Sequence, residues 1–260
     1  MPYRFATQRA DLSAFAAGRV LRSAPGRTAF PARLADEVFQ RCAARLLAAG
    51  IGPPWTLYDP CCGVAHLLAT LGFLHGDAIA TLIGSDVDPD ALGLAERNLA
   101  LLAPGGTAAR AAELRGAAAH FGKPGYADAA NDAEVLGHML AERAGPAGIV
   151  TRLFRADATD HAALTAHLGA RTVDLVVTDV PHGRAATWQD ADGLGAPIDP
   201  LPALLDALRP VLAEHALVAI GTDRTWRAAH PAFARVERIE IGKRRIDLFT
   251  PRRESTPEAP

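Results

Sequence analysis

Short apolar runs alternate with amphipathic helical patterns along most of this 260-residue chain, and this alternation limits the folds that the chain can adopt. The predicted strands are residues 55–59, 78–86, 150–157, 173–179, 215–223 and a pair within 236–251. The predicted helices are residues 31–49, 64–76, 88–102 and one within 197–212. Strands that alternate with helices form a parallel sheet with helices on both faces. We therefore expect an α/β, Rossmann-like fold with a seven-stranded, mostly parallel sheet whose last two strands are antiparallel.

One segment is too long to be a simple crossover between strands. Residues 104–149 are rich in Ala, Gly and Pro and are predicted to be a helical insertion, with helices at 112–121 and 126–143. The predicted domains are an N-terminal basic helical extension at 1–50, an α/β domain at 51–253 that carries the insertion, and a disordered tail at 254–260.

The composition indicates the compartment. Hydrophobic residues make up 49% of the chain, enough for a sizeable core. Two of the three cysteines, Cys61 and Cys62, are neighbours, which argues against a disulfide framework and favours a reducing cytoplasm. We see no signal peptide and no apolar run long enough to cross a bilayer, so we expect a cytoplasmic protein without a membrane partner.

The net charge of −2 conceals two basic ends. Residues 1–50 carry eight basic and three acidic side chains, and residues 224–253 carry nine basic and three acidic side chains. A polyanion such as a nucleic acid would be attracted if the two ends fold near one another. The alternative is that these arginines only solvate helices.

A five-residue loop follows the first predicted strand. It consists of Asp59, Pro60, Cys61, Cys62 and Gly63. Glycine lets the backbone approach a ligand, and the helix that follows offers free N–H groups. Dinucleotide-binding loops have the pattern GxGxxG and hold a pyrophosphate. Here an acid precedes a single glycine, so the loop repels phosphate and attracts the ammonium group of a methionine moiety. We therefore predict S-adenosylmethionine as the ligand; the alternative is an ordinary strand–helix turn.

Aspartates also end the second and third predicted strands. The predicted cofactor contacts there are Asp86, Val87, Asp157 and Ala158. Asp86 lies 23 residues after Gly63, where an acid accepts hydrogen bonds from ribose hydroxyls. Asp157 is placed to accept a hydrogen bond from the adenine amino group. The alternative is that Asp157 or Asp160 only caps the next helix.

The sequence Thr-Asp-Val-Pro-His-Gly at 178–183 ends the fourth predicted strand. It resembles the (Asp/Asn)-x-Pro-aromatic motif of methyltransferases that modify nitrogen atoms of bases. The lone pair of such a nitrogen is delocalised into the ring, so an acceptor must hold its proton while a flat side chain stacks on the base. Asp179 is the predicted acceptor and also borders the cofactor, Pro181 rigidifies the turn, and His182 is the predicted stacking ring. The alternative is a simple turn.

The adjacent cysteines suggest two other chemistries. A Pro-Cys pair is the nucleophile signature of cytosine-C5 methyltransferases, but here the pair follows the first strand, which is the wrong strand for that role. A zinc site from Cys61, Cys62 and His66 lacks a closed set of ligands. We therefore predict no metal, and we expect both thiols to be small apolar wall residues.

The chain as a whole resembles one family, the avilamycin-resistance 23S rRNA guanine methyltransferases of actinomycetes. The segments that carry this resemblance are residues 23–41, 59–63, 85–92, 98–102, 121–126, 176–183 and 222–224. The first and fifth of these segments are not general methyltransferase features, so the resemblance is specific. One departure is His182, because the family has Tyr at this position; Val64, Ala65 and His66 also differ from the family loop.

The resemblance implies a class I methyltransferase that uses S-adenosylmethionine to modify a guanine nitrogen of 23S rRNA, alone or in the large ribosomal subunit, and so confers resistance to an orthosomycin antibiotic. The residues predicted to bind RNA are Arg4, Arg22, Arg27, Lys123, Arg184, Lys243, Arg244 and Arg245. Two alternatives remain open: a small-molecule methyltransferase, and an RNA-binding relative with weakened catalysis.

Overall fold

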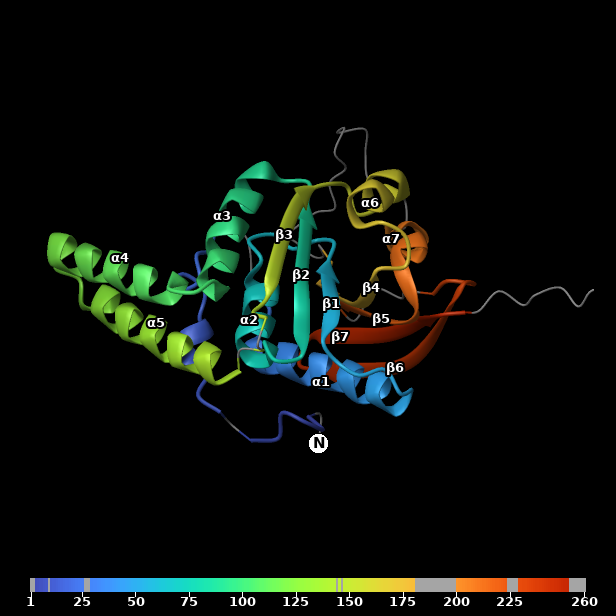
Figure 1. Cartoon of the computed structure of the whole chain (residues 1–260), viewed down its shortest axis with the longest axis horizontal. Coiled ribbons are helices and arrows are strands. Elements are labelled where there is room, and N and C mark those ends of the chain that lie inside the picture. The colour runs from blue at the N-terminus through green and yellow to red at the C-terminus, as the bar shows by residue number, and fades with distance from the viewer. Residues whose placement is uncertain are drawn as a thin grey trace, which may run out of the picture.

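The computed structural model describes residues 3–8, 10–25, 29–143, 145, 147–180, 200–223 and 229–252. Seven strands form one sheet in the order β3-β2-β1-β4-β5-β7-β6 (Figure 1). The strands are β1 (Trp55–Asp59), β2 (Ile79–Asp86), β3 (Val150–Arg155), β4 (Val173–Asp179), β5 (Leu212–Asp223), β6 (Phe233–Ile241) and β7 (Arg244–Pro251). β7 is antiparallel to both of its neighbours, and the other pairs are parallel. The predicted seven-stranded Rossmann-like sheet is confirmed.

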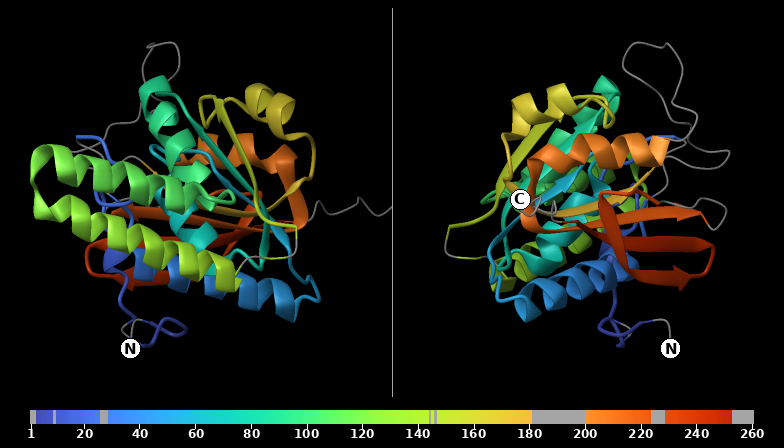
Figure 2. Two further views of the ribbon diagram at one scale, coloured as in Figure 1. Left: turned by 60° about the vertical axis from the view of Figure 1, so that its left-hand side comes forward. Right: turned by 90° about the vertical axis from the view of Figure 1, so that its right-hand side faces the viewer.

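Helices cover both faces of the sheet. They are α1 (Ala32–Ala48), α2 (His66–His75), α3 (Pro89–Leu99), α4 (Gly106–Phe121), α5 (Pro124–Arg143), α6 (His161–Leu168) and α7 (Pro200–Leu208), with short 3₁₀ turns at Ser13–Phe15, Ala100–Leu102 and Arg209–Val211. In the right-hand view of Figure 2, α6 and α7 lie on one side of the sheet and α1 lies on the other. No helix among the described residues is both long and apolar enough to span a bilayer.

Side chains that alternate along each strand divide the interior into two cores. Leu57, Leu82 and Leu175 pack with α1, α2 and α3 in one core. Their neighbours Tyr58, Ile83 and Val176 pack with α6 and α7 in the other. This alternation with period two is expected for strands that are buried on both faces.

The predicted insertion is a hairpin of two helices, α4 and α5, which lie side by side and project beyond the β3 edge of the sheet (Figures 1 and 2). α4 begins at Gly106, six residues before the predicted start at 112, because the Ala-rich stretch after Gly105 has a high helix propensity. Ala129, Ala133 and Leu136 bury the base of the hairpin in the core that contains α1.

The N-terminal residues are built into the same core. Val20 and Leu21 are fully buried, and Leu34, Val38 and Phe39 of α1 pack with them. The buried Glu37 carboxylate accepts hydrogen bonds from the backbone N–H groups of Arg4, Phe5 and Ala6 at 2.6–2.8 Å, which ties the start of the chain to α1.

Candidate active site

The carboxyl ends of the four adjacent strands β3, β2, β1 and β4 lie side by side at one end of the sheet, which we call the carboxyl edge. An aspartate lies at or just after each of these strand ends. In the order of the strands these are Asp157, Asp86, Asp59 and Asp179. β7 runs in the opposite direction, so Arg244, its first residue, pairs in register with Asp223 at the carboxyl end of β5. The same edge therefore gathers four carboxylates and the Arg244 guanidinium.

The loop between β1 and α2 wraps around the end of β2. The Cys61 N–H donates to Asp59 Oδ1 at 3.1 Å, the Cys62 N–H donates to the Ser85 carbonyl at 2.9 Å, and the Gly63 N–H donates to Asp86 Oδ2 at 2.8 Å. Gly63 has φ +54°, in the left-handed region that favours glycine. This geometry brings the predicted cofactor loop and the predicted ribose acid into direct contact.

Two buried polar side chains, Asn98 and Ser85, hold this loop by hydrogen bonds to its backbone. Asn98 Nδ2 donates to the carbonyls of Val64 (2.8 Å) and Arg22 (2.9 Å), and its Oδ1 accepts from the Arg22 N–H at 2.8 Å. The Ser85 hydroxyl donates to the Pro60 carbonyl at 3.3 Å. The sequence did not predict either role, because Asn98 lies within a helical pattern and its partners are 34 and 76 positions away.

Asp59 is only 2% exposed at the centre of the edge. Burial raises the pKa of Asp59 to about 7, the negative charges of Asp86 and Asp179 act in the same direction, and the hydrogen bond from the Cys61 N–H opposes the rise. The predicted attraction of Asp59 for an ammonium group therefore needs a carboxyl that ionises near neutral pH. A ligand cation beside Asp59 would favour its ionised form.

Asp86 already accepts two backbone hydrogen bonds. Its Oδ1 accepts from the Asp88 N–H at 3.0 Å and its Oδ2 accepts from the Gly63 N–H at 2.8 Å. These two bonds fix the orientation of the Asp86 carboxylate. The carbonyl of Val87 accepts from Arg155 Nε at 2.9 Å, which joins this turn to the end of β3.

The structure shows which of Asp157 and Asp160 caps the next helix. Asp160 caps α6 by accepting from the N–H groups of Ala162 and Ala163, both at 3.0 Å. Asp157 Oδ1 accepts from the Thr159 N–H at 2.8 Å and from the Thr159 hydroxyl at 2.7 Å. Asp157 is thus held at the edge beside the buried residue Ala158, and its contact with adenine stays a prediction.

The cysteines of the loop form part of its wall. Cys62 is 7% exposed, and its sulfur would lie 2.9 Å from a β-carbon at Gly84, so the glycine in β2 makes room for the thiol. Burial, together with the negative charges of Asp59 and Asp86, raises the pKa of Cys61 well above its usual range. A neutral thiol fits the predicted wall residue better than a nucleophile.

Asp179 ends β4 and has a partner that its sequence neighbourhood does not contain. Arg244 Nη1 contacts Asp179 Oδ2, and the Arg244 guanidinium carbon also lies 5.1 Å from the centre of the Phe30 ring. Asp179 Oδ1 is buried and has no hydrogen-bond partner among the described residues. The sequence predicted Arg244 as an RNA contact, and the structure places it on the predicted catalytic acid.

Several predicted residues lie outside the described residues. These are Pro181, His182 and Gly183 of the fourth-strand motif, the RNA-binding candidates Arg27 and Arg184, and the tail at 254–260. Asp179 is thus the one residue of the predicted catalytic set that lies within the described residues.

Comparison with known proteins shows the family of this chain. The family described as "RRNA methyltransferase AviRa" matches residues 1–244. The chain belongs to the AviRa family. The "23S rRNA (guanine(2535)-N(1))-methyltransferase" of Streptomyces viridochromogenes is 43% identical over 242 residues, 93% of each chain. Two solved structures of the rRNA methyltransferase aviRa from that organism have TM-scores of 0.81 and 0.82, at 42% and 41% identity, and cover 95% of this chain and 95–96% of theirs. The predicted family and methyltransferase fold are confirmed.

The predicted RNA-binding residues of this AviRa-family chain fall into two groups. Arg4, Lys123 and Lys243 have exposed side chains, at the N-terminal segment, the α4–α5 turn and the β6–β7 turn. Phe121, two residues before Lys123 at the end of the hairpin, is 59% exposed, and its ring centre lies 6.0 Å from that of Tyr126.

The second group is engaged within the protein. Arg22 pairs with Glu113 at 2.6 Å, Arg244 pairs with Asp179, and Arg245 is 9% exposed and pairs with Glu240 at 3.2 Å. Each of these three side chains already has an acidic partner within the protein, and their contact with RNA stays a prediction.

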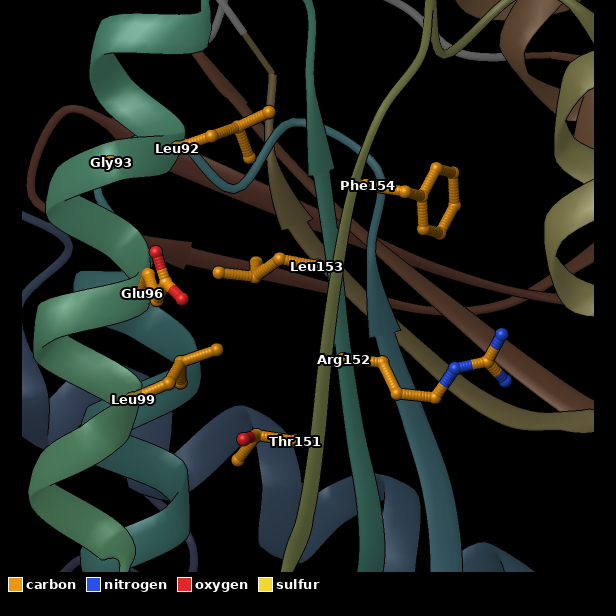
Figure 3. A pocket seen from close by; sticks show the side chains of 8 residues that line it. All are labelled: Leu92, Gly93, Glu96, Leu99, Thr151, Arg152, Leu153 and Phe154. Carbon is orange, nitrogen blue, oxygen red and sulfur yellow. The ribbon is translucent and has the colours of Figure 1, made fainter.

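A separate shallow pocket of about 390 Å³ lies between α3 and β3 (Figure 3). Its lining residues are Leu92, Gly93, Glu96 and Leu99 from α3 and Thr151, Arg152, Leu153 and Phe154 from β3. In Figure 3, Leu153 points toward α3, whereas Arg152 and Phe154 point to the other side of the strand. None of the aspartates of the carboxyl edge lines this pocket, so it is distinct from the candidate active site.

Proposed function

We propose that this protein transfers the methyl group of S-adenosylmethionine to a ring nitrogen of a guanine in 23S rRNA. The observation that carries the proposal is the row of aspartates at the carboxyl edge, in a chain that belongs to the AviRa family of rRNA methyltransferases. The relative that is 43% identical is named for the N1 atom of guanine 2535, and we propose the same class of target here.

The residues of the edge fit a cationic adenosyl cofactor. Asp59 is buried beside the loop glycine, Asp86 is fixed by two backbone N–H groups, and Asp157 lies at the next strand end. In this proposal Asp59 binds the ammonium group, Asp86 accepts from the ribose hydroxyls, and Asp157 accepts from the adenine amino group. S-Adenosylmethionine, when bound, supplies an electrophilic methyl group on a positively charged sulfur.

Asp179 acts on the substrate side of the same edge. Its carboxylate accepts a hydrogen bond from the target nitrogen and so increases electron density on that atom. When the nitrogen is methylated it loses its proton, which the Asp179 carboxylate would accept and pass to water. A guanine must leave its stack to reach a side chain at this depth, so the substrate is a flipped-out base.

The RNA contacts in this proposal come from the exposed cations. Lys243 lies at the turn that precedes Arg244, next to the active edge, and Arg4 lies on the N-terminal segment. Lys123 and the exposed ring of Phe121 form the end of the hairpin, where a cation and an aromatic ring suit phosphate binding and base stacking. An rRNA substrate also implies a cytoplasmic location.

The proposal is tested by transfer of a tritiated methyl group to 23S rRNA and to assembled large subunits, followed by primer extension to find the modified nucleotide. We expect one modified guanine, RNA affinity that falls steeply with salt, and reduced sensitivity to an orthosomycin antibiotic in cells that express the protein. Transfer to small molecules alone, or cofactor binding without transfer to RNA, would contradict the proposal.

A further inference from the structure

Arg244 lies between two regions that are far apart in the sequence. Its guanidinium contacts the carboxylate of Asp179, 65 residues away, and lies 5.1 Å from the ring of Phe30, which directly precedes α1. The side chains of Arg244 and Asp179 are 19% and 17% exposed, and Phe30 is 5% exposed. An arginine enclosed in this way is preorganised and not a mobile surface cation.

Gly221 shapes the opposite side of the same carboxylate. It pairs in register with Asp179 across the β4–β5 ladder. A β-carbon at Gly221 would lie 2.8 Å from Asp179 Oδ1 and 3.3 Å from both the Ile246 side chain and the Thr178 carbonyl. The absent side chain therefore leaves the space that Oδ1 occupies, while Oδ2 is held by Arg244.

We propose that Arg244 and Gly221 are positioning residues for Asp179, and that Arg244 does not bind RNA phosphate. This inference rests on the proposed function. The guanidinium holds Oδ2 and the missing side chain at Gly221 leaves room for Oδ1, so the carboxylate meets the target nitrogen in one orientation. Arg244 also supplies positive charge at an edge where Asp59, Asp86 and Asp179 lie close enough for their charges to interact.

A phosphate contact and a positioning role change different kinetic constants. Loss of a positioning residue lowers kcat and leaves the KM for RNA nearly unchanged, because the interaction matters in the transition state. Loss of a phosphate contact raises the KM for RNA and makes the dependence of log affinity on log salt concentration less steep by about 0.7–0.9.

The experiment compares R244Q, R244K, D179N and the R244Q/D179N double variant in methylation of 23S rRNA, with steady-state reactions to obtain kcat and the KM for RNA and single-turnover reactions to isolate the chemical step. We expect R244Q to lower kcat by about 10- to 100-fold, which corresponds to the coupling energies measured for contacting pairs. R244K should recover part of the loss, because lysine restores the positive charge but not the planar set of N–H donors of the guanidinium. In the D179N background, R244Q should cause no further loss.

G221A tests the positioning of Asp179 independently, because it can be measured in the presence of the native Asp179 carboxylate. A methyl group at this position must displace Asp179 Oδ1 from its space, so we expect a lower kcat with unchanged cofactor affinity. The matched control is R171Q, which breaks the exposed ion pair between Arg171 and Glu214 and should leave both kinetic constants within about twofold of the unmodified protein.

The outcomes separate the inference from the proposed function. A raised KM for RNA with unchanged kcat and a shallower salt dependence in R244Q would overturn the positioning role. Additive losses in R244Q and D179N would do the same. If D179N itself keeps full kcat, the proposed role of Asp179 fails, whereas absence of transfer by the unmodified protein would refute the methyltransferase proposal. Circular dichroism and thermal unfolding of each variant confirm that the comparison is made between folded proteins.

Discussion

The cofactor half and the substrate half of the edge hold their aspartates in different ways. Asp59, Asp86 and Asp157 each accept a hydrogen bond from the backbone N–H two residues later, at 3.1, 3.0 and 2.8 Å. Asp179 is instead held by Arg244, 65 residues away, and by the space at Gly221. Local turns hold the three proposed cofactor acids, and the Gly63 N–H adds one hydrogen bond to Asp86. Tertiary packing holds Asp179, the proposed substrate acid.

This difference predicts separable functions. An acid fixed by its own turn keeps its geometry when distant parts of the chain change, so cofactor binding should tolerate substitutions in β5 and β7. An acid fixed from a distance depends on the register of β4, β5 and β7. Variants of the two halves should therefore affect different steps of one reaction.

The largest effect is expected for D179N. Loss of the anionic acceptor should lower kcat by about 100-fold or more, the range of general acid–base contributions, while the cofactor dissociation constant changes little. Rapid-quench methylation and calorimetric cofactor titration measure the two quantities. Equal losses in kcat and cofactor affinity would show that the two halves are not separable.

D86A should show the opposite pattern. It removes hydrogen bonds from a charged acceptor, each worth about 1.5–3 kcal/mol, so we expect cofactor affinity to fall by roughly 10- to 100-fold. At saturating cofactor, turnover should recover much of its original value. D90A is the matched control, because Asp90 is an exposed acid at the start of the adjacent helix α3. An unchanged dissociation constant for D86A would contradict the assignment.

D59N tests the charge at the centre of the edge. The pKa of Asp59 is raised to about 7 in the folded protein, from an ordinary value of 3.8, because the carboxyl is buried. Between these values the folded state binds more protons than the unfolded state, so this group lowers stability as pH rises toward 7. D59N avoids that loss.

Without cofactor, D59N should therefore be more stable than the unmodified protein at pH 8, by on the order of 1–3 kcal/mol, and the difference should shrink at pH 5.5. Urea unfolding at the two pH values measures this. Cofactor affinity should fall at the same time, because asparagine does not neutralise an ammonium group. A stability difference that is independent of pH would count against an ionisable Asp59.

The smallest effect is expected at the end of the helical hairpin. K123A should make the slope of log RNA affinity against log salt concentration less steep by about 0.7–0.9. The KM for RNA should rise a few-fold, and kcat should not change. F121A should raise the KM for large-subunit RNA without changing the salt dependence. R171A, which removes an exposed arginine paired with Glu214, is the control. Unchanged RNA affinity in both hairpin variants would exclude this surface.

The two basic ends show where charge counting alone misleads. They do fold near one another, as the nucleic-acid hypothesis required, because Arg41 and Arg45 of α1 contact Glu237 of β6. The two basic ends therefore meet through Glu237. Arg19 and Arg22 pair with Asp132 and Glu113 of the helical hairpin. Much of the apparent positive charge at the N-terminus therefore stabilises the fold instead of facing a ligand.

The sequence by itself determined the alternation of strands and helices, the aspartates at the strand ends and the family. It also offered Asp160 as one of two candidates for the cap of α6. These features depend on residues two to four positions apart or on the pattern of the whole chain, so they can be read without coordinates. Only the tertiary structure decided the partner of Arg244, the support of the loop by Asn98 and the raised pKa of Asp59. These depend on which distant segments pack together and on how far that packing excludes water.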